Sequence, residues 1–124
     1  MPNETALPVL VVEDDAPTRK LLQAVLTHMG YASAFATNGG EAIGMLRTND
    51  YAVIVLDVMM PDVSGREVVE FIVAESISTP VVICSAAGPK ALTGFDTNVV
   101  KAIIRKPFDI EEFVKIVTTV ARQS

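Results

Sequence analysis

The sequence predicts an α/β fold in which a five-stranded parallel sheet is covered by helices on both faces. Short apolar runs recur along the chain, amphipathic segments lie between them, and the two kinds of segment alternate about five times. Half of the 124 residues are hydrophobic and 20% are charged, a composition typical of globular proteins. We therefore predict a doubly wound (βα)5 unit, arranged as a three-layer sandwich.

The strands are predicted from runs of successive apolar residues, many of them β-branched. Such runs lack the alternation of a half-exposed strand and are typical of strands with both faces covered. They occupy residues 7–12, 52–56, 81–84 and 102–104, and a weaker run at 33–36 predicts an edge strand. Parallel strands joined by helices take right-handed crossovers. For five strands of this length we predict the flavodoxin-like order 2-1-3-4-5.

The helices are predicted from their apolar faces and from the residues that begin them. Between residues 18 and 29 the apolar side chains fall on one face, and Gly30 ends the segment. Three later helices each begin with a capping residue followed by an acidic residue three positions on. These pairs are Asn38 with Glu41, Ser64 with Glu67, and Asp109 with Glu112.

The segment between the fourth and fifth strands fits a helix poorly. Residues 88–100 contain Gly88, Pro89 and Gly94, and no apolar stripe runs through them. Glycine and proline both weaken a helix. We expect a short or distorted fourth helix here.

Composition and charge exclude several classes of partner. The net charge of −5 argues against direct binding to nucleic acid or to an anionic membrane. Cys84 is the single cysteine, so no internal disulfide forms, and we expect it to be a small buried hydrophobe. Without a signal peptide or a long apolar run, a cytoplasmic location is expected. The length suits one domain over residues 1–124, with an ordered core at about 7–122 and no output domain.

Polar and charged side chains that can bind ligands or take part in reactions follow the predicted strands. In an open parallel sheet, ligands bind beyond the carboxyl ends of the strands, where these residues would meet. They are Glu13, Asp14 and Asp15 after the first strand, Asp57 after the third, Ser85 after the fourth, and Lys106 after the fifth.

Carboxylates gathered at one edge repel one another, and each disfavours the ionised form of its neighbours. A hard divalent cation such as Mg²⁺ relieves this repulsion, and it prefers carboxylate and phosphate oxygens. One carboxylate could then attack phosphorus, while the Lys106 ammonium and the Ser85 hydroxyl bind the phosphoryl oxygens. Each residue alone also has an ordinary explanation, as a helix cap, a turn or a backbone hydrogen-bonder. Their combination at successive strand ends favours a site where a cation and a phosphoryl group meet.

At these residues the chain resembles the receiver domain of two-component response regulators, over nearly its whole length. The resemblance is specific in the order and spacing of its motifs. They are Val11-Val12-Glu13-Asp14-Asp15 followed by Pro17 and Arg19, Asn38-Gly39 with Glu41-Ala42, Leu56-Asp57-Val58-Met59-Met60-Pro61-Asp62 with Ser64-Gly65, Ser85-Ala86, and Lys106-Pro107-Phe108.

The resemblance implies a role for each acidic residue. Asp57 would be the phosphoacceptor. Asp14 and Asp57 would bind Mg²⁺ (or Mn²⁺) directly, the backbone carbonyl of Met59 would complete the protein ligands, and Glu13 would assist. Asp15 lies one place beyond the usual acidic pair, so we interpret it as a helix cap.

The resemblance also implies the remaining chemistry and the partner. Ser85 would be the switch hydroxyl, and Lys106 would bind the phosphoryl group, with a cis bond to Pro107. The donor would be a phosphohistidine on a sensor histidine kinase or a phosphotransfer protein. The chain would catalyse only its own aspartyl phosphorylation and dephosphorylation, and its downstream effector stays open.

One departure from the family bears on output. Receivers usually carry Tyr or Phe three places before the lysine, where this chain has Ile103. We therefore predict that Asp57 is phosphorylated normally but that the change is passed on to a partner protein in an atypical way.

The alternative function is an interaction module whose binding to a partner does not depend on phosphorylation. An aspartyl phosphohydrolase is disfavoured because Met59 stands where those enzymes need a second acid. A flavin site is weaker still, since the first loop is acidic.

Overall fold

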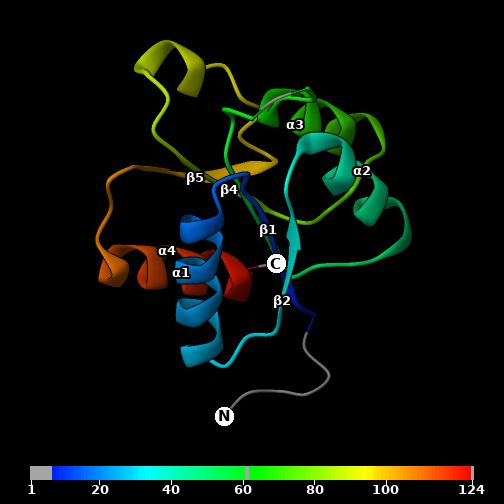
Figure 1. Ribbon diagram of the computed structural model, residues 1–124. Coiled ribbons are helices and arrows are strands. Elements are labelled where there is room, and N and C mark those ends of the chain that lie inside the picture. The colour runs from blue at the N-terminus through cyan, green and yellow to red at the C-terminus, as the bar shows by residue number, and fades with distance from the viewer. Residues whose placement is uncertain (1–6, 61, 124) are drawn as a thin grey trace.

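The computed structural model describes residues 7–60 and 62–123, so residues 1–6, Pro61 and Ser124 of the predicted domain and motifs lie outside the described residues. One parallel sheet forms, with the strand order β2-β1-β3-β4-β5 (Figure 1). The strands are β1 (Val9–Val12), β2 (Ser33–Ala36), β3 (Val53–Leu56), β4 (Val81–Ser85) and β5 (Val100–Arg105). The predicted flavodoxin-like order is confirmed, and the predicted runs are wrong only by a residue or two at their ends.

Four α-helices connect or follow the strands. They are α1 (Ala16–His28), α2 (Gly39–Thr48), α3 (Gly65–Ala74) and α4 (Ile110–Gln123). Asp15 and Asn38 cap α1 and α2 by accepting hydrogen bonds from the main chain, as predicted. Ser64 and Glu67 form a complete capping box at the start of α3. Among the described residues, none of the helices is both long and apolar enough to span a membrane.

The sheet separates two hydrophobic clusters, one for each pair of helices. Figure 1 shows α1 and α4 on one face of the sheet and α2 and α3 on the other. Successive strand residues point to opposite faces, so Leu10 and Val12 pack toward α2 and α3 while Val9 and Val11 pack toward α1 and α4. This two-sided burial explains why the strands are continuous apolar runs rather than alternating ones.

The fourth connection contains a single 3-10 turn, η1 (Pro89–Leu92), and no α-helix among its described residues. This 3-10 turn stands where a short or distorted fourth helix was expected, so that expectation is confirmed. Arg66 of α3 holds this segment in place by donating hydrogen bonds to the carbonyls of Ala91 (3.0 Å) and Thr93 (2.8 Å). Its guanidinium also lies 4.1 Å from the centre of the Phe95 ring. Ile103, on the neighbouring edge strand β5, is 41% exposed.

Cys84 in β4 is buried, as predicted, and this burial raises the pKa of its thiol to about 12 from 9.0. The thiolate is the reactive form, so the folded chain should react with a thiol reagent on the order of a thousandfold more slowly than an ordinary cysteine near neutral pH. Because protonated Cys84 is favoured in the folded state, raising the pH toward 12 should weaken folding. The difference in reactivity is measured by comparing the rate of Cys84 alkylation in the folded chain with the rate in urea, and equal rates would contradict the prediction.

Candidate functional site

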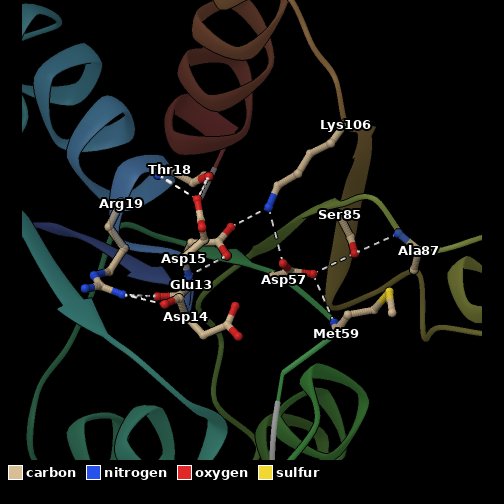
Figure 2. A network of polar contacts seen from close by, with 10 residues as sticks. All are labelled: Glu13, Asp14, Asp15, Thr18, Arg19, Asp57, Met59, Ser85, Ala87 and Lys106. Carbon is tan, nitrogen blue, oxygen red and sulfur yellow. Dashed lines mark hydrogen bonds and ion pairs between the residues drawn. The ribbon is translucent and has the colours of Figure 1, made fainter.

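The predicted polar residues meet at the carboxyl edge of the sheet. Glu13 and Asp14 directly follow β1, Asp57 directly follows β3, and Lys106 directly follows β5, while Ser85 is the last residue of β4. Because all five strands are parallel, their carboxyl ends lie on the same side. Figure 2 shows these side chains converging there, with Asp57 near the centre of the group.

The Asp57 carboxylate is buried, with 6% of the residue exposed, and three donors bind it. Its Oδ1 accepts hydrogen bonds from the Ser85 hydroxyl at 2.6 Å and from the Met59 backbone N–H at 3.0 Å. Its Oδ2 accepts from Lys106 Nζ at 3.2 Å. The Ser85 hydroxyl in turn accepts the backbone N–H of Ala87 at 3.2 Å. Asp57 is therefore fixed by a hydroxyl, an amide and an ammonium.

Lys106 bridges two carboxylates that come from different strands. Its Nζ lies 2.5 Å from Glu13 Oε1 and 3.2 Å from Asp57 Oδ2. Burial raises the pKa of Glu13, although the hydrogen bonds from Lys106 and from the Asp15 backbone oppose this shift. Burial alone would lower the pKa of Lys106, but the hydrogen bond to Glu13 and the nearby Asp57 charge raise it. The lysine ammonium therefore stays charged and balances the negative side chains around it.

Glu13, Asp14 and Asp57 form a group suited to a divalent cation. Each offers one carboxylate oxygen, and the three oxygens all lie within 4.8 Å of one another. Asp14 is exposed, and in the described part of the chain its carboxylate has no hydrogen-bond partner. An all-oxygen set that includes an open carboxylate fits a hard cation such as Mg²⁺.

The loop between β1 and α1 is fixed by its own hydrogen bonds. Asp15 caps α1 by accepting the Thr18 backbone N–H at 3.0 Å, and bonds from Thr18 lower the pKa of the Asp15 carboxyl. Arg19, one turn further along α1, donates from Nη1 to the carbonyl oxygens of Glu13 and Asp14, at 3.0 Å each. The cap was predicted. The contact from Arg19 was not, because no sequence pattern marks a side chain that bonds to main-chain carbonyls.

Of the remaining features that the resemblance implied, the structure contains one and leaves another as a prediction. The peptide bond between Lys106 and Pro107 is cis, as the resemblance implied. The Met59 backbone contacts Asp57 through its N–H, whereas cation binding by its carbonyl stays a prediction. His28, the last residue of α1, is exposed.

Comparisons with known proteins agree with this geometry. The profile of the response regulator receiver domain matches residues 9–118. The transcriptional regulatory protein ResD of Bacillus subtilis is 38% identical over 124 residues, covering 98% of this chain and 50% of that protein. The response regulator ArlR of Staphylococcus haemolyticus is 33% identical over 118 residues, covering 93% of this chain and 53% of that protein. The chain thus spans about half the length of the curated relatives it matches.

Solved structures show the same likeness. The receiver domain of the Francisella response regulator 1452 superposes with a TM-score of 0.83 at 29% identity, covering 94% of this chain and 98% of that one. The response regulator TrrA of Thermotoga maritima, solved in complex with Mg²⁺ and BeF, gives a TM-score of 0.83 at 26% identity, covering 92% and 98%. The profile match over most of the sequence, together with the converging strand-end residues, shows that the chain belongs to the response regulator receiver domain family.

Proposed function

We propose that the chain is a phosphoacceptor switch of a two-component system and that Asp57 is the residue phosphorylated. The observation that carries this proposal is the set of contacts around Asp57. Its carboxylate is buried at the sheet edge and is bonded by Ser85 and Lys106, two donors that could equally bind phosphoryl oxygens. The phosphoryl donor would be a phosphohistidine on a sensor histidine kinase or a phosphotransfer protein.

In the proposed reaction, an Asp57 carboxylate oxygen forms a bond to phosphorus as the bond from phosphorus to the imidazole nitrogen breaks. The imidazole keeps the electron pair of that bond and takes up a proton. Negative charge is spread over the three other phosphoryl oxygens during the transfer. The Lys106 ammonium and the Ser85 hydroxyl are the donors positioned to bind these oxygens.

Asp14 and Asp57 would hold the divalent cation, Mg²⁺ or Mn²⁺, the Met59 carbonyl would complete the protein ligands, and Glu13 would assist. When bound, the cation supplies positive charge that offsets both the carboxylates and the phosphoryl oxygens. The oxygens within 4.8 Å of one another support this assignment. So does the related TrrA, which was solved in complex with Mg²⁺ and BeF.

Phosphorylation would act by shifting an equilibrium between two conformations, which a partner protein then distinguishes. We propose that this conformational change is passed to the partner protein through a surface that differs from that of typical receivers. Where receivers usually have an aromatic residue, Ile103 lies 41% exposed on β5, and the adjacent connection has η1 instead of an α-helix. The chain would catalyse no reaction other than the phosphorylation and dephosphorylation of its own aspartate.

Incubation with a small acyl phosphate and Mg²⁺ tests the assignment of Asp57. We expect the intact mass to increase by one phosphoryl group, and we expect Asp57→Asn to abolish the increase because the nucleophilic oxygen is lost. Chelation of Mg²⁺ should also prevent it. Asp62→Asn is the matched control, since Asp62 is an exposed acid in the same loop and should leave the increase unchanged. An unmodified wild-type chain, or a phosphorylated Asp57→Asn variant, would refute the proposal.

A further inference from the structure

We propose that Arg19 is a positioning residue for the cation site, and this inference rests on the proposed function. Its guanidinium does not touch the carboxylates that would hold the cation. It binds instead the main chain that carries two of them, and in this way sets where the Glu13 and Asp14 side chains project. The geometry assigns Arg19 a role that is separate from those of Asp57, Ser85 and Lys106.

Two hydrogen bonds carry the proposal. Arg19 Nη1 has two hydrogens, and it donates one to the Glu13 carbonyl and one to the Asp14 carbonyl, at 3.0 Å each. The Arg19 backbone N–H also donates to the Asp15 carbonyl at 2.9 Å, so the side chain starts from a fixed point on α1. Figure 2 shows the guanidinium approaching the main chain of Glu13 and Asp14, while Lys106 contacts the carboxylates of Glu13 and Asp57.

Asp14 depends on Arg19 more than Glu13 does. The Glu13 carboxylate is buried and is held directly, by Lys106 Nζ on Oε1 and by the Asp15 backbone N–H on Oε2. The Asp14 carboxylate is exposed and has no such partner among the described residues. Its direction therefore follows from its backbone, and the Asp14 carbonyl is bound by Arg19. Without Arg19, Asp14 would sample orientations that do not point toward Glu13 and Asp57.

The positive charge of Arg19 and its positioning hydrogen bonds should affect Mg²⁺ binding in opposite directions. A guanidinium beside the site repels a divalent cation, so its removal should tighten Mg²⁺ binding if charge alone mattered. If Arg19 positions the loop, its removal should weaken Mg²⁺ binding despite the lost repulsion. Arg19→Lys keeps the charge but loses the nitrogen that donates to both carbonyls. The two explanations therefore predict different outcomes for the same pair of variants.

Titration of the unphosphorylated chain with Mg²⁺, followed by backbone amide chemical shifts, separates these explanations. We expect Arg19→Gln and Arg19→Lys each to raise the dissociation constant for Mg²⁺ on the order of tenfold, as groups that orient metal ligands commonly do. Lys20→Gln is the matched control. It removes one positive charge from the next position of α1, where the side chain is exposed and bonds to neither carbonyl, and should weaken nothing.

The proposal is overturned if Arg19→Gln binds Mg²⁺ as tightly as the wild type or more tightly, or if Arg19→Lys binds it unchanged. Amide spectra without Mg²⁺ confirm that each variant is folded, and if Arg19→Gln fails to fold, Arg19→Lys decides alone. A wild-type chain whose amides near Glu13, Asp14 and Asp57 do not respond to Mg²⁺ would instead refute the cation site of the proposed function. The wild-type titration thus distinguishes the two failures.

Discussion

Replacing Lys106 with methionine is expected to lower the free energy of unfolding by about 3 kcal/mol in the absence of divalent cations. Lys106 is the cation that bridges Glu13 Oε1 and Asp57 Oδ2, and both carboxylates belong to buried residues. Its removal leaves two negative charges facing each other with little access to water. Urea denaturation of the wild type and of the variant measures the loss.

The same variant should show a distinctive pH dependence. Burial already raises the pKa of Glu13, and loss of the lysine should raise it further. A carboxyl with a raised pKa in the folded state favours folding when protonated, so the deficit of Lys106→Met should shrink as the pH falls and grow as it rises through that pKa. Lys101→Met, at an exposed position of β5, is the control and should change stability by less than about 0.5 kcal/mol. A deficit that is absent, or equal at every pH, would contradict this account.

Replacing Gly65 with alanine is expected to cost about 3 kcal/mol of unfolding free energy and to slow phosphorylation of Asp57. A Cβ at this position would lie 2.4 Å from the Asp57 carbonyl oxygen and 2.5 Å from the Val58 Cα. Both atoms belong to the backbone and cannot turn aside, so α3 would have to move away from the loop that carries Asp57. Urea denaturation and the rate of the mass increase with an acyl phosphate measure the two effects.

Gly44→Ala provides the matched control because it makes the same change in a helix with free space. A Cβ at Gly44, in α2, would have no heavy atom within 4 Å apart from its chain neighbours and the backbone of its own helix. This variant should gain roughly 0.5–1 kcal/mol, since alanine favours helix more than glycine does. If Gly65→Ala were as stable as Gly44→Ala, the close approach of α3 to Asp57 would not constrain the site.

Sequence reasoning predicted the parts of the fold that depend on local patterns. Two-sided burial produced continuous apolar runs, so the strands could be located, and the cap at Asn38 and the capping box at Ser64 located two helix starts. Both ends of β5 were harder to predict. This strand lies at the edge of the sheet and its residues alternate between buried and exposed, so polar residues interrupt the apolar run. The run at 102–104 therefore covers only part of the strand, which extends from Val100 to Arg105.

The candidate site was predictable as a set of residues but not as a set of contacts. Parallel strands place their carboxyl ends together, which was enough to group Glu13, Asp14, Asp57, Ser85 and Lys106. That Lys106 reaches both Glu13 and Asp57 depends on side-chain direction across three strands, and the sequence holds no signal for it. The same is true of Arg66, whose bonds to Ala91 and Thr93 join segments 25 and 27 residues apart.

The contact between Lys106 and Glu13 spans 93 residues of the sequence, and this separation has a consequence for the newly synthesised protein. While the chain emerges from the ribosome, Asp57 is present long before β5 and the lysine that follows it. An acceptor without Lys106 lacks the ammonium that we expect to bind the phosphoryl oxygens. Asp57 should therefore become able to accept a phosphoryl group efficiently only after β5 and Lys106 have been synthesised and have folded onto the sheet.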